Sequence, residues 1–345
     1  MAMFGRSSKI RVEVFAKTDQ GRTREHNEDR FLIADLTRKT SSLQPDVRQH
    51  DIGRRGTLLV VADGMGGAAA GELASQMATE AIYAHLAKTW TGDDATPQRF
   101  AYRLKEAVET ANASIHAHAK AHPEVRGMGT TTTAAGVLND HLYLTQVGDS
   151  RAYLIRDGEA HQLTKDQSLM QRLVEAGELT EEEAAQSERR NIILQALGPD
   201  PKVKVDLTHQ ELRRGDILVL CSDGLSGQVK KDEIGKIVSS APDLVSACEQ
   251  LVTLANQRGG PDNITVVVAR FDGDGLRYSG GATPGDVGHQ VYPLIDTETS
   301  TEPVPIYRGS RPPVPNSENR TRTRTLVLAG VAILAALAWY ITRSK

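Results

Sequence analysis

The segment Thr57-Leu-Leu-Val-Val-Ala-Asp-Gly-Met-Gly-Gly67 places an acidic residue directly after an apolar run. A short run of this kind is typical of a strand buried in a protein core. Two other segments resemble it: Asp216-Ile-Leu-Val-Leu-Cys221 leads into Asp223, and Asp262 precedes the run Ile264-Thr-Val-Val-Val-Ala269. We therefore expect three acidic side chains at the ends of interior strands.

The motif Asn27-Glu28-Asp29 adds further carboxylates. Buried carboxylates repel one another and are costly to desolvate unless a cation or hydrogen bonds compensate. Gathered at the ends of core strands, they predict a site for Mg²⁺ or Mn²⁺, which prefer oxygen ligands. The alternative is that Asp-Gly pairs only mark turns. A single motif favours that alternative, whereas the whole set favours a metal site.

The secondary structure expected from the pattern is mixed. Leu104, Val108, Ala111 and Ile115 have helical spacing, and Glu72 to Lys88 reads as another helix. Further elements with clear patterns are a helix with the stripe Leu244, Cys248, Leu251 and Ala255, strands over His141 to Val147 and Arg151 to Ile155, and a hairpin at Asp157-Gly158. Nearby strands and hairpins favour antiparallel sheets packed against helices.

Six short motifs follow one another along the chain: Arg24-Glu-His-Asn-Glu-Asp29, Asp63-Gly-Met-Gly-Gly67, Gly127-Met-Gly-Thr-Thr131, Val147-Gly-Asp-Ser-Arg151, Cys221-Ser-Asp-Gly-Leu225 and Gly260-Pro-Asp-Asn-Ile-Thr265. In this order they resemble the metal-dependent PP2C-type (PPM family) serine/threonine protein phosphatases, bacterial branch. The resemblance extends from about Ile10 to Phe271. It implies an α+β fold, in which a central antiparallel β-sandwich is flanked by helices and carries metals in a cleft at one edge.

The same resemblance implies hydrolysis of phosphoserine and phosphothreonine by attack of a water that bridges two Mn²⁺ or Mg²⁺ ions. Asp63 would bridge the two ions and take part in catalysis, and the carbonyl oxygen of Gly64 would bind the second ion. A glycine there lets the backbone approach an ion closely. Asp223 and Asp262 correspond to the remaining ligands of the first ion.

Arg24 corresponds to the arginine that grips the substrate phosphate during catalysis, a task that suits a guanidinium fork. Glu28 and Asp29 correspond to ligands of the second ion or of its waters, with a slight preference for Asp29. Asp149 corresponds to a ligand of a third, weaker ion. Many relatives have a second acidic residue where this chain has Gly227, so a turn role for Asp149 stays open.

Two other departures from the family pattern concern chemistry and specificity. Met65 stands where eukaryotic relatives have a histidine that is a candidate general acid, and a thioether cannot donate a proton. Leu163 to Gly198 resembles the family's flap beside the active site. Within it Gln167 replaces a histidine and Ser187-Glu188 replaces a His-Pro pair of many relatives. Substrate preference therefore stays open.

Composition sets broad limits. The chain has 345 residues, 39% apolar content and a net charge of −3, which give no sign of a nucleic-acid-binding surface. Cys221 and Cys248 are too few for a disulfide framework and read as core residues. No cysteine lies in a phosphate-cradling loop, which speaks against a cysteine-dependent phosphatase.

The C-terminal part has a different character. Residues 1–271 would form the phosphatase domain and 272–325 a linker, because seven of 14 prolines lie between Pro284 and Pro315. Leu326 to Ile341 is free of charge and flanked by basic residues, which predicts a transmembrane anchor over 326–342. With no apolar signal at the N-terminus, we expect a cytoplasmic domain tethered to the membrane. A membrane serine/threonine kinase is the partner expected by analogy.

Two other functions stay open at this point. One is an anchored binding module without metal; the presence of Asp63, Asp223 and Asp262 disfavours it. The other is a phosphatase of a small-molecule monoester, which the same ligands do not exclude. A zinc site at His116, His118 and His122 is less favoured than a solvated helix end. Similarly, the basic segment from Arg38 to Arg55 is read as a solvated insertion rather than a lipid-binding loop.

Overall fold

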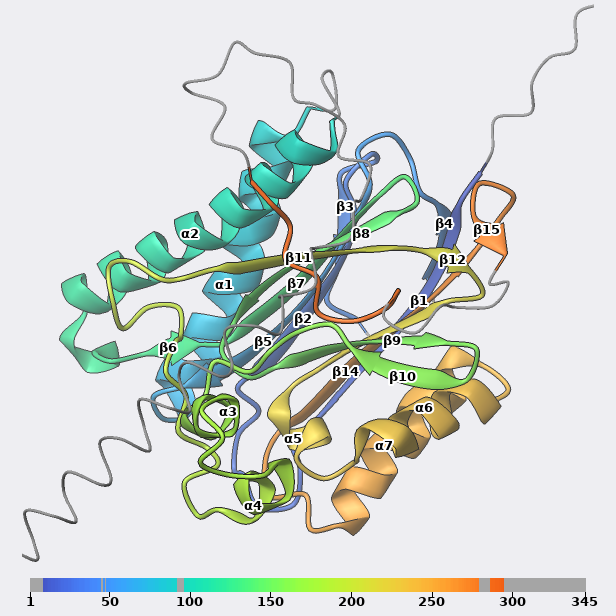
Figure 1. Ribbon diagram of the computed structural model, residues 1–345. Helices are drawn as coiled ribbons and strands as arrows, with labels where there is room; N and C mark the ends of the chain where they lie inside the picture. Colours follow the sequence, from blue (N-terminus) through green and yellow to red (C-terminus); the bar gives the residue numbers. More distant parts are fainter. Residues whose placement is uncertain (1–8, 45, 47, 92–95, 279–285, 295–345) are drawn as a thin grey trace, which may run out of the picture. The chain divides into compact units, whose positions relative to one another are not determined.

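The computed structural model describes residues 9–44, 46, 48–91, 96–278 and 286–294 (Figure 1). All of them belong to one compact unit, which spans residues 1–295. The predicted anchor at residues 326–342 lies outside the described residues. Among the helices that are described, none is long and apolar enough to cross a membrane.

Two antiparallel sheets form the centre of this unit. The first sheet has the strand order β10 (Glu159–Gln162), β9 (Arg151–Arg156), β13 (Ile217–Cys221), β14 (Ile264–Asp272), β1 (Arg11–Asp19) and β4 (Arg48–Asp51). The second has the order β11 (Asp206–Glu211), β8 (His141–Val147), β7 (Thr132–Leu138), β5 (Thr57–Met65), β2 (Asp29–Asp35) and β3 (Thr40–Ser42), and β6 (Gly129–Thr130) extends β5. A small parallel pair joins β12 (Arg213–Arg214) to β15 (Arg277–Tyr278).

Helices cover both outer faces of the pair of sheets (Figure 1). On the second sheet lie α1 (Ala68–Thr89) and α2 (Pro97–Ala121), and on the first lie α6 (Lys231–Ser240) and α7 (Leu244–Gln257). The shorter helices are η1 (Pro123–Val125), α3 (Leu169–Glu175), α4 (Glu181–Gln186) and α5 (Asp223–Ser226). The predicted α+β sandwich flanked by helices is thus confirmed.

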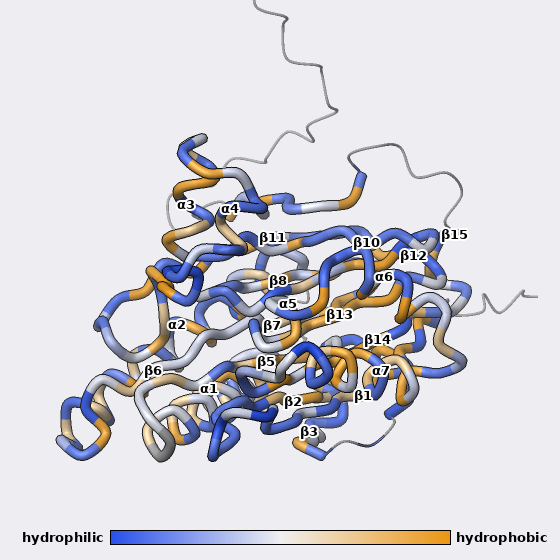
Figure 2. The backbone as a smooth tube through the Cα atoms, turned by 90° about the horizontal axis from the view of Figure 1, so that it is seen from below, coloured by the Kyte–Doolittle hydropathy of each residue, from blue (hydrophilic) through white to orange (hydrophobic). Residues whose placement is uncertain are grey.

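Three apolar clusters hold the four layers together. The middle one lies between the two sheets and includes Val61, Leu144 and Val267, none more than 1% exposed. Figure 2 shows apolar residues concentrated along the central strands. Burial of a large aliphatic side chain contributes about 1.5–3 kcal/mol relative to exposure, so these clusters fix the strand ends that carry the acidic motifs.

The observed elements differ from the expected ones at two strand ends. The run that begins at Thr57 stays extended through Asp63 to Met65, because Gly64 and Met65 pair with β6. Asp223 does not sit in a turn but opens the short helix α5. Elsewhere the expected helices and the strands β8 and β9 are present.

The folded body also continues beyond residue 271, where the sequence had predicted a linker. Strand β14 ends at Asp272, and Leu276 is buried at 5% exposure. Residues 286–294, here called the β11 strap, lie along the free edge of β11. Val291 bridges Thr208, and the ring of Tyr292 packs against Tyr143 at a centroid distance of 5.4 Å. Proline content alone does not reveal such pairing, because an edge strand and a linker are both tolerant of proline.

A fragment of residues 1–271 should therefore be less stable than one of residues 1–295. The shorter fragment loses buried Leu276 and the strap's contacts with β11, and its free energy of unfolding should fall by at least about 2 kcal/mol. Urea denaturation of both purified fragments measures the difference. Equal unfolding midpoints with equal slopes would show that the strap adds nothing to the fold.

Candidate metal centre

The strand ends bring the predicted acidic residues to one edge of the sandwich. Asp29 begins β2 directly opposite Asp63 near the end of β5, since the two are Cα partners in the antiparallel ladder. On the facing sheet, β13 ends just before Asp223 and β14 begins just after Asp262. Asp63 interacts electrostatically with Asp29, Asp223, Asp149 and Asp262. The five aspartates predicted from separate motifs are therefore neighbours.

Asp29 is fully buried and oriented by a hydroxyl group. Ser222 Oγ donates to Asp29 Oδ2 at 2.7 Å, and the same oxygen of Ser222 accepts from Thr265 N–H at 3.0 Å. Ser222 precedes α5 in the capping position, but its hydroxyl makes no capping bond to that helix. Burial, together with the charges of Asp223 and Asp262, raises the pKa of Asp29 from 3.8 to about 7.

The backbone of Asp63 is held by the threonines of the Gly127–Thr131 motif. Thr131 N–H donates to the carbonyl oxygen of Asp63 at 2.8 Å, and Thr130 Oγ1 donates to the same oxygen at 2.9 Å. The side chains of Asp63 and Asp223 act on each other electrostatically. Burial and the neighbouring aspartates raise the pKa of Asp63 well above its ordinary value, and burial followed by the charge of Asp262 raises that of Asp223.

Asp149 lies in the loop between β8 and β9 and is 8% exposed. Its neighbour Ser150 shares a hydrogen bond of 2.7 Å with Thr131, which ties this loop to the segment that holds Asp63. Burial first, and then the charges of Asp223 and Asp166, raise the pKa of Asp149 to about 8. The loop therefore belongs to the acidic site.

Arg24 reaches the same site from the loop between β1 and β2. Its Nη2 lies 2.7 Å from Asp262 Oδ2, and its side chain is 50% exposed. The hydrogen bond to Asp262 raises the pKa of Arg24 above its already high value. Asn263 fixes this loop through two hydrogen bonds. Its Oδ1 accepts from Glu28 N–H at 2.8 Å, and its Nδ2 donates to the carbonyl oxygen of His26 at 2.8 Å.

Glu28 and Asp29 point to different parts of the site. A Cβ added at Gly71 in α1 would stand 2.0 Å from Glu28 Oε2, so the Glu28 carboxylate lies in the space left by this glycine. Gly64 is equally confined, since a Cβ there would meet the carbonyl oxygen of Gly71 at 2.1 Å. Glu28 thus lies on the Gly64 side, whereas Asp29 faces Asp223. Gly64 is needed for close packing of β5 against α1, a reason that the sequence did not reveal.

The chemistry of the residues fits divalent cations. Asp29 Oδ1 and Asp223 Oδ1 are buried and have no hydrogen-bond partner within the part of the chain that the structure describes. Such oxygens are costly to bury without a cation or a donor. Within the described residues, no group of three or more His, Cys, Asp or Glu side chains is placed so that it could hold one metal ion. Bound ions would therefore complete their shells with backbone oxygens and water, as Mg²⁺ commonly does.

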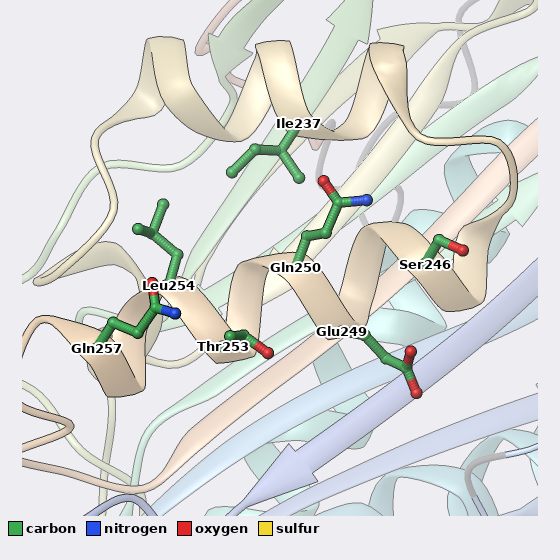
Figure 3. Close-up of a pocket in the computed structure, with 7 residues that line it drawn as sticks. All are labelled: Ile237, Ser246, Glu249, Gln250, Thr253, Leu254 and Gln257. Carbon is green, nitrogen blue, oxygen red and sulfur yellow. The ribbon is translucent and has the colours of Figure 1, made fainter.

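Sequence reasoning missed the residues that orient the acidic groups. Ser222 lies in the motif Cys221–Leu225 and Asn263 in the motif Gly260–Thr265, but the sequence pointed only to the adjacent aspartates. A serine before Asp-Gly and an asparagine after Pro-Asp were the available signals. A pocket between α6 and α7 does not belong to this site (Figure 3). It is lined by Ile237, Ser246, Glu249, Gln250, Thr253, Leu254 and Gln257.

Known proteins that are similar to this chain in sequence are phosphatases. The sequence model of the family described as Protein phosphatase 2C matches residues 37–265. The serine/threonine protein phosphatase PstP of Mycobacterium tuberculosis is 44% identical over 212 residues, which cover 61% of this chain and 40% of PstP. The serine/threonine phosphatase stp of Listeria monocytogenes is 36% identical over 258 residues, which cover 74% of this chain and 94% of stp.

Among solved structures, the catalytic domain of a PstP phosphatase in complex with two manganese ions is similar with a TM-score of 0.61 and 38% identity. The match covers 76% of this chain and 99% of that domain. Fold and site together define an α+β sandwich with a divalent-cation site at one edge. The chain belongs to the protein phosphatase 2C family.

The raised pKa values predict how pH affects the protein without divalent ions. Asp29 and Asp149, with pKa values of about 7 and about 8 when folded, favour the protonated form in the folded state. Their stabilising effect is complete below the unfolded value near 3.8 and is lost as pH rises through about 7 to 8. Surface carboxylates with lowered pKa, such as Glu233, are ionised throughout this interval.

In EDTA, the melting temperature should therefore fall between about pH 5 and about pH 8. Excess Mn²⁺ should reverse most of this loss, since a ligand at one hundred times its Kd adds about 2.7 kcal/mol. Differential scanning fluorimetry across this range, with EDTA or Mn²⁺, provides the measurement. Parallel curves with and without Mn²⁺ would contradict the assignment of these carboxylates to a cation site.

Proposed function

We propose that this chain is a metal-dependent protein phosphatase that removes phosphate from serine and threonine side chains. The observation that carries the proposal is the meeting of five aspartates and Arg24 at one edge of the sandwich, in a chain of the protein phosphatase 2C family. The phosphatases similar to this chain include one solved with two manganese ions. Phosphoproteins are the corresponding substrates.

In this proposal Asp63 would be shared by two ions, with Asp223 and Asp262 on the first and the carbonyl oxygen of Gly64 on the second. Ion binding would bring the three carboxylates closer together than they lie in the described structure. When bound, the two ions lower the pKa of a water between them and neutralise phosphoryl oxygens. Asp29 and Glu28 are both assigned to the second ion or its waters, with a slight preference for Asp29. Asp149 is assigned to a weaker third ion.

Arg24 supplies a positively charged side chain to the site. Its guanidinium, half-exposed and at present paired with Asp262, can exchange one carboxylate oxygen for phosphate oxygens without moving far. A planar fork matches two oxygens of a phosphate. Met65 contributes no proton, so the leaving alkoxide must take its proton from another group.

Replacing Asp63 by Asn tests the assignment directly. The variant keeps the size of the side chain but weakens the ligand shared by both ions. Phosphate release from phosphothreonine and phosphoserine peptides in Mn²⁺ should fall at least about tenfold, the lower end of the range for disturbing a metal site. The wild type should lose its activity in EDTA.

The matched control is Asp140→Asn, the same change in the exposed turn after β7, which should keep wild-type turnover. Both variants should melt cooperatively. A folded Asp63→Asn variant with more than about a tenth of wild-type turnover would contradict the two-ion assignment. A wild type inactive in both Mn²⁺ and Mg²⁺ would contradict the proposed activity itself.

We also propose that the chain is attached to the cytoplasmic membrane through residues 326–342, with the phosphatase domain in the cytoplasm. Support comes from the sequence: Leu326 to Ile341 has no charged residue, and Arg320, Arg322 and Arg324 precede it. An apolar segment of about 17–25 residues spans a bilayer. A membrane serine/threonine kinase would be the natural opposing partner.

Membrane fractionation of cells that express the full chain or residues 1–295 tests this attachment. The full chain should sediment with membranes and resist carbonate extraction, and the fragment should stay in the supernatant. A full chain that carbonate releases completely would exclude an integral anchor.

A further inference from the structure

Gln167 is one of several residues through which the flap contacts the rest of the domain; Asp166 pairs with Arg151, and Leu197 exchanges backbone hydrogen bonds with Thr130. Gln167 N–H donates to the carbonyl oxygen of Gly148 at 2.9 Å, and Gln167 Oε1 accepts from Gly148 N–H at 3.0 Å. The carbonyl oxygen of Gln167 accepts from Leu194 N–H at 2.7 Å, on the returning end of the flap. One residue therefore holds both the acidic loop and the flap.

The side-chain amide of Gln167 also contacts the second sheet. Its Nε2 donates to Asp206 Oδ2 at 2.9 Å, at the first residue of β11. β11 in turn pairs with β8 on one side, and on the other the β11 strap donates and accepts backbone hydrogen bonds. Asp206 therefore belongs to a strand that is hydrogen-bonded on both sides, whereas the flap is more exposed.

Gly148 directly precedes Asp149, and its φ of +99° belongs to the region that favours glycine. A Cβ there would also stand 2.7 Å from Thr131 Cβ. The peptide groups around Gly148 are thus confined on the Thr131 side and hydrogen-bonded on the Gln167 side. Gln167 and Gln146 Nε2, which donates to the carbonyl oxygen of Gly148 at 3.0 Å, together hold the backbone next to Asp149.

We propose that Gln167 is a positioning residue. It fixes the Gly148–Asp149 loop and the flap relative to β11, so that the Asp149 carboxylate is placed to bind a cation. The inference rests on the proposed function. A glutamine side chain suits the role because its oxygen accepts from Gly148 while its nitrogen donates to Asp206. A carboxylate or an apolar side chain of similar length makes at most one of these bonds.

Gln167→Met removes the bonds of the side-chain amide to Gly148 and Asp206, and its longer ones to the carbonyl oxygens of Lys204 and Gln146, with little change in length or charge. The weakest of the bound Mn²⁺ ions should lose about tenfold in affinity, as is typical when the support of a metal site is disturbed. The tighter ions should change by less than about twofold, since Asp63, Asp223 and Asp262 keep their own supports. Isothermal titration with Mn²⁺ and Mn²⁺ electron paramagnetic resonance measure these affinities on the full chain.

Turnover gives a second readout. The Mn²⁺ concentration for half-maximal phosphate release should rise about tenfold, whereas KM at saturating Mn²⁺ should change by less than about threefold. The matched control is Gln171→Met, the same change on a half-buried flap residue whose side-chain amide donates to Glu175 on the same helix. It should match the wild type in both readouts.

An exchange of partners tests the hydrogen bond itself. Gln167→Glu keeps the acceptor for Gly148 but brings two carboxylates together at Asp206, and it should weaken the weakest ion site. Adding Asp206→Asn restores a donor–acceptor pair and the wild-type net charge. The double variant should return to within about threefold of wild-type affinity. Asp206→Asn alone keeps an acceptor for Gln167 and should change little.

The outcomes separate this inference from the proposed function. A wild type without Mn²⁺-dependent turnover would defeat the proposed function. An active wild type whose Gln167→Met variant binds every Mn²⁺ ion normally would overturn the positioning role alone. Equal weakening of all ions, or a double variant no better than Gln167→Glu, would also overturn it, because general loosening of the fold produces that result.

Discussion

Repulsion among carboxylates at one edge of the sandwich is the constraint on which the rest of the site depends. Asp29, Asp63, Asp149, Asp223 and Asp262 act on one another electrostatically, and a domain without compensation would not keep them together. The hydrogen bond from Ser222 to Asp29 and the ion pair of Arg24 with Asp262 compensate only part of this repulsion. Buried oxygens of Asp29 and Asp223 remain without partners in the described structure, as expected for ligands of cations.

The fold supplies the rigidity that such an arrangement needs. Each acidic residue stands in a strand end, at the start of a short helix or in a loop next to a strand end, and the strands are fixed by apolar clusters on both faces. Polar side chains then join neighbouring loops across the edge: Asn263 holds the β1–β2 loop, and Thr131 links Asp63 to Ser150. The flap lies at this edge, and Gln167 is one of the residues that join it to the two sheets.

Much of this organisation was predictable from the sequence, since an apolar run followed by Asp identifies both a strand and its end. The acidic residues were expected on that basis, the helices α1, α2 and α7 from the helical pattern of their sequences, and the α+β class from nearby strands, hairpins and the family resemblance. Their orientation was not predictable. Ser222 could have capped α5, and only the structure shows that its hydroxyl turns to Asp29. The β11 strap was missed because its pairing with β11 involves residues some eighty positions apart, which local composition does not encode.

Anomalous X-ray diffraction from crystals grown with Mn²⁺ tests the central claim most directly. The account predicts two strong peaks about 3.5–4 Å apart at this edge. Asp63 should contact both peaks, and Asp223 and Asp262 should contact one of them. A single ion, or ions bound away from Asp63, would contradict the claim that the acidic residues are gathered to hold a pair of cations.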